Sequence, residues 1–285
     1  MNCPKRPRDR GVSTVVDVTL FVLLVSASVL SLSTAGTTVL EDSTAVGREE
    51  AAVETLATTT ATVRYDLGTE TRTGETVHRV RHGTLAELLG EAALAAVTVD
   101  GTRLSPYGDG FVGTVGEAVR PVLDGRMQVV ATWTPYPGSS LRGRVTVGPS
   151  PPPDATVHAA TLAVDSGVPA AREPALAAAD TGYRGVADVV ARRTVHGLFP
   201  PRRTRVALDG GAVDANVTRA AFARTASAYG SDTRLETGVT PATYDLTVAV
   251  SNRTRAELRD RFDTPQAAAS AVRTDRVTVV VRTWS

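Results

Sequence analysis

The stretch RDRGVSTVVDVTLFVLLVSASVLSLSTAG, residues 8–36, decides how the chain is organised. Residues 12–35 form a run of 24 residues with one charge, that of Asp17. As an α-helix this run measures about 36 Å, at about 1.5 Å per residue, whereas a bilayer core is about 30 Å thick. Buried helices of soluble domains are rarely apolar on every face over such a length. The chain has no second run of this kind, so the sequence predicts a single transmembrane helix over residues 12–35.

The charges on either side orient this predicted helix. The first charges after it are Glu41 and Asp42, and the basic residues before it are Lys5, Arg6, Arg8 and Arg10. Cytoplasmic flanks of membrane helices carry the excess of Lys and Arg. We therefore expect a single-pass protein of the cell membrane with a cytoplasmic N-terminus and an extracytoplasmic region over residues 36–285. A cleavable secretory signal fits less well, because the apolar run is long and STAG at 33–36 only loosely imitates a cleavage site.

The segment RDRGVSTVVDVTLFVLLV resembles the class III signal of archaeal type IV pilin-like proteins, in which a short basic leader ends in a small residue before the hydrophobic segment. The resemblance implies cleavage by a prepilin-type peptidase between Gly11 and Val12, which removes the leader 1–11 and leaves the helix. Bacterial pilins carry an acid at the fifth mature position, whereas Asp17 would be the sixth. Further stretches, TWTPYPGSSLRGRVTVGPSPPPDA, HGLFPPRRTR and VTVVVRTWS, resemble uncharacterised haloarchaeal pilin-like membrane proteins, a resemblance that implies no particular activity.

Two features of the predicted helix bear on assembly. An ionisable residue within a membrane helix costs a few kcal/mol to insert and marks a functional position. In a filament Asp17 would neutralise the amino terminus of a neighbouring subunit; alternatively, lying about 8 Å along the helix from Val12, it reaches the cytoplasmic interface. Ala27, Ser31 and Ala35 place small side chains on one stripe, which permits close helix approach in lipid, although such residues are also common fillers. The expected partners are the bilayer and sister subunits or further copies of the chain.

The composition predicts a folded outer region. Of 285 residues, 42% are hydrophobic and 21% charged, which suffices for one or two globular domains. Lys and Arg number 31 against 30 Asp and Glu, so no nucleic-acid partner is expected. Cys3, the single cysteine, precedes the apolar run, which excludes an intrachain disulfide or a cysteine zinc cluster in the outer region.

We expect this outer region to be α+β, with two lobes over 36–148 and 155–285 joined by the proline-rich segment PSPPPD at 149–154; a surface loop within one domain is the alternative. In the first lobe, hydrophobic periodicity and turn residues predict a helical spine over 41–63, strands over 61–67 and 76–82, a helix over 84–97, a second helix within 108–123 that ends near Pro121, and two strands within 126–148. In the second lobe they predict strands over 155–164, 244–250 and 276–285, and helices over 182–199, 217–230, 255–262 and 265–273.

The search for chemistry predicts no enzyme and no cofactor. His78 and His82 are four residues apart, but on a strand that spacing is about 13 Å, too far to chelate one metal ion. The chain contains neither a G-x-S-x-G elbow nor a phosphate-binding G-x-x-x-x-G-K motif.

Two further patterns concern the surface. PPRRTR at 200–205, interpreted as a basic turn, and the upstream Arg192 and Arg193 suit carboxylates, phosphates or sulfated sugars; alternatively, these arginines are solvated and pair with nearby acids. The sequons that begin at Asn216 and Asn252 predict N-glycosylation on the external side.

Taken together, these patterns predict a non-catalytic, membrane-anchored, pilin-like structural or assembly subunit with an outward-facing α+β head. The alternative is an extracytoplasmic binding module that keeps its leader as an uncleaved signal anchor.

Overall fold

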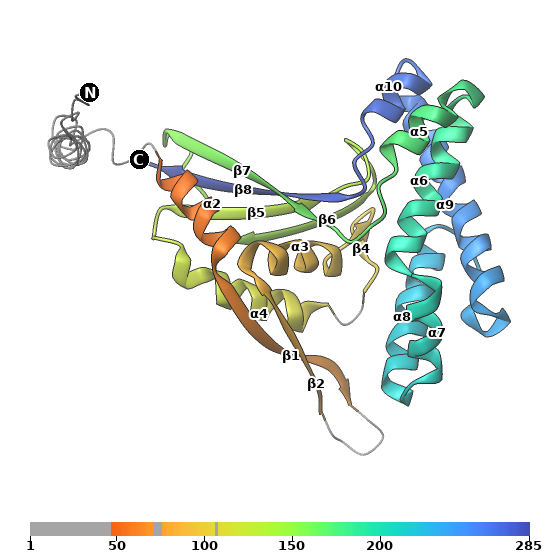
Figure 1. The fold of residues 1–285 in the computed structure, drawn as a ribbon, viewed down its shortest axis with the longest axis horizontal. Helices are drawn as coiled ribbons and strands as arrows, with labels where there is room; N and C mark the ends of the chain where they lie inside the picture. The colour runs from red at the N-terminus through yellow and green to blue at the C-terminus, as the bar shows by residue number, and fades with distance from the viewer. Residues whose placement is uncertain (1–46, 71–75, 106–107) are drawn as a thin grey trace, which may run out of the picture. The chain divides into compact units, whose positions relative to one another are not determined.

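The computed structural model describes residues 47–70, 76–105 and 108–285 (Figure 1). The predictions for Gly11, Val12, Asp17, Ala27, Ser31 and Ala35 lie outside these residues. Among the described helices, none has the length and apolarity needed to cross a membrane. Residues 48–285 form one compact unit that mixes helices and strands, which confirms the predicted α+β class.

A six-stranded antiparallel sheet is the centre of this unit, with strand order β4-β3-β6-β5-β8-β7. The long strands alternate buried and exposed residues or are rich in valine, as half-buried and buried strands do. Their positions confirm the strands predicted within 126–148 and over 155–164 and 276–285. The bounds are β3 Thr98–Val99, β4 Thr102–Arg103, β5 Met127–Trp133, β6 Leu141–Val147, β7 Val157–Asp165 and β8 Arg276–Trp284.

The proline-rich segment 149–154 is a loop between β6 and β7. The strands that precede it and those that follow it belong to one sheet, since β5 pairs with β8 in a register that places Val130 opposite Val280. The expected division into lobes 36–148 and 155–285 is therefore replaced by the alternative, a loop within one domain. Proline stiffens the connection but does not separate two cores.

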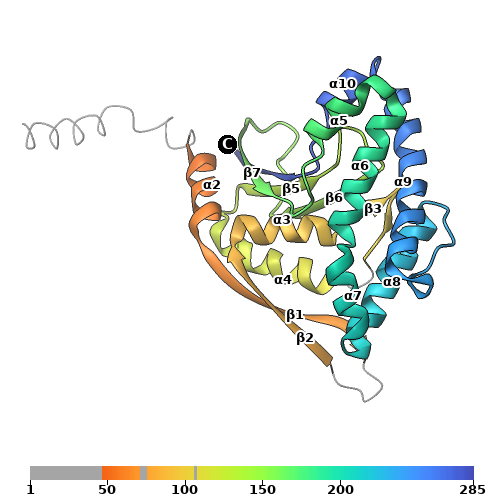
Figure 2. The same cartoon turned by 45° about the vertical axis from the view of Figure 1, so that its right-hand side comes forward.

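Helices α2 (Arg48–Thr58), α3 (Leu85–Ala95) and α4 (Asp109–Val119) lie on one side of the sheet (Figures 1 and 2). Helix α3 buries Leu85, Leu88 and Leu89 against the strands, and a capping box between Thr84 and Glu87 stabilises its start. Together these three helices and the valines of the strands form the main hydrophobic core.

The strands predicted over 61–67 and 76–82 are also present, as β1 (Thr60–Glu70) and β2 (Thr76–Thr84), and they pair with each other in an antiparallel hairpin. The helical spine predicted over 41–63 ends earlier, at Thr58. The reason is that residues from Thr60 onward, rich in Thr and Val, pair with β2 instead of continuing the helix.

A group of helices is inserted between β7 and β8 and stands beside the sheet (Figure 2). Two smaller hydrophobic cores hold it together. Its helices are α5 Arg172–Ala178, α6 Tyr183–Leu198, α7 Pro201–Asp209, α8 Ala212–Ala228, α9 Val239–Arg261 and α10 Pro265–Ser270.

Two predictions in this group are wrong. Residues 244–250 are not a strand but part of α9, in which Leu246 and Val250 are buried while Tyr244 and Val248 are exposed. Their apolar residues alternate as in a strand, but with Val239 and Ala242 they also follow the helical period, and packing selects the helix. The basic turn at 200–205 is the start of α7, where Pro201 occupies the first turn, a position that suits proline.

Candidate functional site

A groove of about 580 Å³ lies along the outer seam between α6 and α9. The two helices run antiparallel (Figures 1 and 2), and the Ser251 hydroxyl on α9 donates a hydrogen bond to Asp188 on α6. Positions spaced four apart share one face of a helix, and this spacing produces both walls. The α6 wall consists of Arg184, Asp188, Arg192 and His196, and the α9 wall of Thr240, Thr243, Tyr244, Thr247, Val248, Ser251, Asn252 and Arg255.

The opposite faces of the same helices explain why this face stays open. Helix α6 buries Val186, Val190 and Val195, and α9 buries Leu246 and Val250. Apolar side chains thus hold the two helices together from the inside, while the polar stripes of both helices meet at the surface.

Positive charge dominates the groove. Among its lining residues only Asp188 is acidic, against three arginines. Asp188 accepts the hydrogen bond from Ser251 and lies 3.9 Å from the Nε of Arg184; the Arg184 side chain is 78% exposed, so this ion pair is weak. Within the described residues, Arg192 and Arg255 have no ion-pair partner. Two guanidinium groups are therefore free to meet an anion.

Hydroxyl groups and one exposed ring complete the lining. The Thr243 hydroxyl donates to the Val239 carbonyl at 2.8 Å, and the Thr247 hydroxyl to the Thr243 carbonyl at 2.7 Å, so both oxygens remain available as acceptors. Tyr244 is 69% exposed and Val248 43% exposed, which places a small apolar surface beside the arginines. The groove can thus offer charge, hydrogen bonds and ring contact to a polar ligand.

Comparison with protein-family models identifies the family of this chain. Residues 16–284 match the model of the family of unknown function DUF7284. The chain belongs to this family. The match includes both walls of the groove and most of the run predicted to span the membrane, and the description of DUF7284 assigns no activity. No curated protein and no solved structure matches the chain.

A second polar cluster of the DUF7284 protein joins α9 to the sheet. The Glu257 carboxylate accepts hydrogen bonds from the Tyr136 hydroxyl at 2.7 Å, from the Ser140 amide at 3.2 Å, from the Ser140 hydroxyl and from Arg253 Nε at 3.1 Å. Arg253 also pairs with Asp100 in the turn between β3 and β4. We call these five residues the α9–sheet junction.

The electrostatics of this junction indicate a structural role. Burial, followed by the hydrogen bond to Glu257, raises the pKa of the Tyr136 hydroxyl. Burial alone would lower the pKa of Arg253, but its hydrogen bonds to Glu257 and Asp100 outweigh burial and raise it. Because the groups of the junction satisfy one another, they fix α9 against the sheet.

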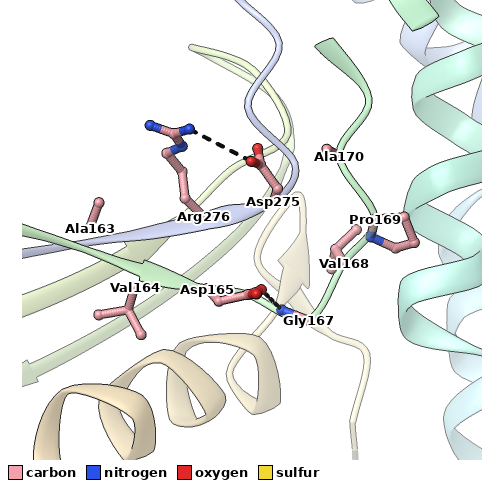
Figure 3. Close-up of a pocket in the computed structure, with 9 residues that line it drawn as sticks. All are labelled: Ala163, Val164, Asp165, Gly167, Val168, Pro169, Ala170, Asp275 and Arg276. Carbon is pink, nitrogen blue, oxygen red and sulfur yellow. Dashed lines mark hydrogen bonds and ion pairs between the residues drawn. The ribbon is translucent and has the colours of Figure 1, made fainter. Parts of the chain in front are cut away.

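A second hollow, of about 630 Å³, lies where β7 leads toward α5 and β8 begins (Figure 3). Small residues such as Ala163, Val168 and Pro169 line most of it. The Asp165 carboxylate accepts a hydrogen bond from the Gly167 amide at 2.6 Å, which closes the turn after β7. The other carboxylate, Asp275, lies 3.6 Å from Arg276. Both acids thus have partners within the chain, and the hollow offers less to a ligand than the groove does.

The predicted glycosylation residues both lie on helices. Asn216 is exposed on α8, and Asn252 is exposed on α9, where it lines the groove. Thr254, the third residue of the second sequon, is buried.

His78 and His82 lie on β2, within the strand predicted over 76–82. His78 pairs with Asp66 on β1, and the Nδ1 of His82 lies 2.9 Å from the Thr62 hydroxyl. In the part of the chain that the structure describes, no three His, Cys, Asp or Glu side chains gather as metal ligands.

The arginines singled out from the sequence divide between two helices. Arg192 and Arg193 lie on α6, where Arg192 lines the groove, and the other three, Arg202, Arg203 and Arg205, lie on α7. Contrary to the alternative of pairing with nearby acids, none of the five forms an ion pair with a described residue, and Arg205 instead donates a hydrogen bond to the Thr240 hydroxyl at 3.2 Å. The α9 wall of the groove was missed, because residues 244–250 were interpreted as a strand; the helical spacing of Val239, Ala242, Leu246 and Val250 was the signal that could have found it.

Proposed function

We propose that this DUF7284 protein is a single-pass, membrane-anchored, pilin-like subunit of an archaeal cell envelope, structural rather than catalytic, with its α+β head outside the cell. The observation that carries the proposal is the position of the head. A compact unit with its own hydrophobic cores begins at Arg48, and residues 36–47 separate it from the apolar run 12–35. The chain thus combines an anchor with a head that supplies its own core.

The first helix of the head supports the same proposal. Helix α2 buries Ala52 and Leu56 in the main core, and the buried Glu49 accepts a hydrogen bond from the Thr283 hydroxyl of β8 at 3.1 Å. The first described helix of the unit is therefore fixed to the sheet.

Processing of the leader tests the pilin-like part of the proposal. We expect the chain recovered from membranes to begin at Val12, as measured by mass spectrometry of its N-terminal peptide. Gly11→Leu should block this cleavage, because the resemblance implies a small residue there, whereas the control Gly36→Leu should not. A wild-type chain that begins at Met1 or Asn2 would refute processing.

Assembly is tested at Asp17. Asp17→Asn removes a charge from the apolar run, so membrane insertion should stay intact. If Asp17 neutralises a neighbouring amino terminus, the variant should yield fewer crosslinked or filamentous species from cells. Equal yields from wild type and variant, at equal expression, would refute this pairing.

The groove between α6 and α9 favours a second candidate function, an extracytoplasmic binding module held by an uncleaved signal anchor. Its free arginines and exposed tyrosine are features of a binding surface rather than of a core. An unprocessed N-terminus together with unchanged assembly of Asp17→Asn would favour this module over the subunit.

A further inference from the structure

We propose that the groove between α6 and α9 binds an acidic oligosaccharide, a short chain of sugars that carry carboxylate or sulfate groups. This inference deepens the binding-module candidate and rests on the extracytoplasmic location of the head. Three properties of the groove carry it: the spacing of its positive charges, the place of its single carboxylate, and the polar character of its walls.

The positive charges stand at two positions along the groove. Arg184 and Arg192 are eight residues apart on α6, which is about 12 Å along the helix. Arg255 lies one turn beyond Ser251, and Ser251 contacts Asp188 across the groove. Because the helices are antiparallel, Arg255 stands opposite Arg184. One small anion cannot span both positions, whereas a chain with acidic groups at intervals can contact both.

Asp188 lies between these two positions, and its negative charge favours a hydrogen-bond donor over an anion at this point of the groove. Its carboxylate is held by Ser251 and is 46% exposed, so it still has lone pairs that face solvent. A continuous row of negative charges would meet repulsion from Asp188. A ligand with hydroxyl groups between its acidic groups would instead donate hydrogen bonds to it.

The walls favour a sugar over an acidic peptide helix. A helix docks through a row of apolar anchors spaced by three or four residues, but among the twelve lining residues only Tyr244 and Val248 offer apolar surface. The remaining lining groups are charged, hydroxyl, amide or imidazole groups. The exposed ring of Tyr244 provides a flat surface for the C–H face of a sugar, and its hydroxyl can donate and accept hydrogen bonds.

Binding can be measured with the full-length chain, produced in a host without N-glycosylation and kept in a neutral detergent. Asn252 lines the groove, so an unglycosylated chain ensures that the titrations report on the protein's own side chains. The probes are a galacturonate hexamer, a sulfated heparin hexasaccharide, the neutral sugar maltohexaose and a hexaglutamate peptide, titrated by calorimetry. We expect one or both acidic sugars to bind, and their relative affinities to show whether carboxylate or sulfate is preferred.

Matched variants locate the binding. Arg192→Gln with Arg255→Gln should weaken binding of the acidic sugar by about tenfold or more, because each charge-assisted contact contributes more than a neutral one. Tyr244→Ala should weaken it by about fivefold through loss of the ring surface. The control Arg202→Gln with Arg203→Gln removes two exposed arginines outside the groove. This control changes the net charge by the same amount as the groove pair does, so its affinity for the acidic sugar should stay within about twofold of that of the wild type.

Three results would overturn the inference. They are failure of both acidic sugars to bind, equal weakening by the groove pair and the α7 pair, and binding of hexaglutamate as tight as that of the sugars with no effect of Tyr244→Ala. The last result would indicate a general polyanion surface or a peptide site. None of these outcomes depends on leader cleavage, so a failure here leaves the anchored-subunit proposal to its own test at the N-terminus.

Discussion

Gly143 provides the sharpest test of how the helices pack on the sheet. It lies on β6 directly beneath α3, and a Cβ added there would stand 1.9 Å from the Ala93 carbonyl oxygen and 2.9 Å from the Ala93 carbonyl carbon. Both are backbone atoms of a helix, so no side-chain rotation can relieve the clash. Overpacking of a core costs about 1–3 kcal/mol and sometimes more. Because α3 supplies Leu88 and Leu89 to the core, we expect Gly143→Ala to lower the free energy of unfolding by about 3 kcal/mol.

A second glycine gives the matched control. Gly113 lies within α4, is exposed, and has nothing within 4 Å of an added Cβ. Gly113→Ala should therefore raise the free energy of unfolding by about 0.5–1 kcal/mol, since alanine loses less backbone entropy than glycine in a helix. The assay is urea denaturation of residues 36–285 followed by circular dichroism. If both variants unfold at the wild-type midpoint, or if Gly143→Ala is the more stable, then α3 does not rest on β6 at this point.

Three other predictions address the head. Residues 36–285 should fold without the anchor, and a random-coil circular dichroism spectrum at both low and high salt would contradict this. Glu257→Gln should lower the free energy of unfolding by about 2–3 kcal/mol, because all four of its partners donate and a glutamine amide has one acceptor oxygen; a loss below about 0.5 kcal/mol in urea titrations would refute the α9–sheet junction. Burial raises the pKa of Tyr136 and Tyr229 above the usual value near 10. As the pH rises, the tyrosines of the unfolded chain therefore lose their protons before those of the folded chain do. The free energy of unfolding should be unaffected by these tyrosines below about pH 10 and should fall above about pH 10 by about 1.4 kcal/mol per pH unit for each tyrosine. A free energy of unfolding that stays constant up to about pH 11 would exclude the raised pKa values.

Local signals in the sequence sufficed for most elements of the sheet and its covering helices. The strands β1, β2 and β5 to β8 and helix α3 are predicted because each contains its own pattern. Valine-rich strands are bounded by Pro, Gly and Ser, and Thr84 and Glu87 mark the start of α3. These local patterns do not specify which strands pair with each other. The pairing of Met127 with Thr283 joins residues far apart in the chain, and no local feature of either strand specifies it.

The wrong strand at 244–250 and the expected division at 149–154 have a common physical origin, because in each case one local pattern fits two structures. Leu246, Val248 and Val250 alternate with polar or small residues, so a short window fits a strand and a helix equally well. The longer window from Val239 to Val250 contains the helical period that the core uses. At 149–154 the prolines predicted a stiff segment, and a stiff segment serves equally as a loop within a sheet or as a linker between domains.

The side chains that line the groove are not needed to hold α6 against α9, so their arrangement points to a ligand. Asp188 and Ser251, which close it, are 63 residues apart, so one wall alone gives no sign of the other. Aromatic residues make up only 5% of the chain, and full burial of a large apolar side chain stabilises a fold by about 1.5–3 kcal/mol. A fold with few aromatic residues nevertheless leaves Tyr244 69% exposed in the groove that contains two unpaired arginines. Because the packing of α6 on α9 depends on the buried faces of these helices, substitutions in the groove should alter binding and leave folding intact, which is the condition under which titrations of the groove variants report on a ligand.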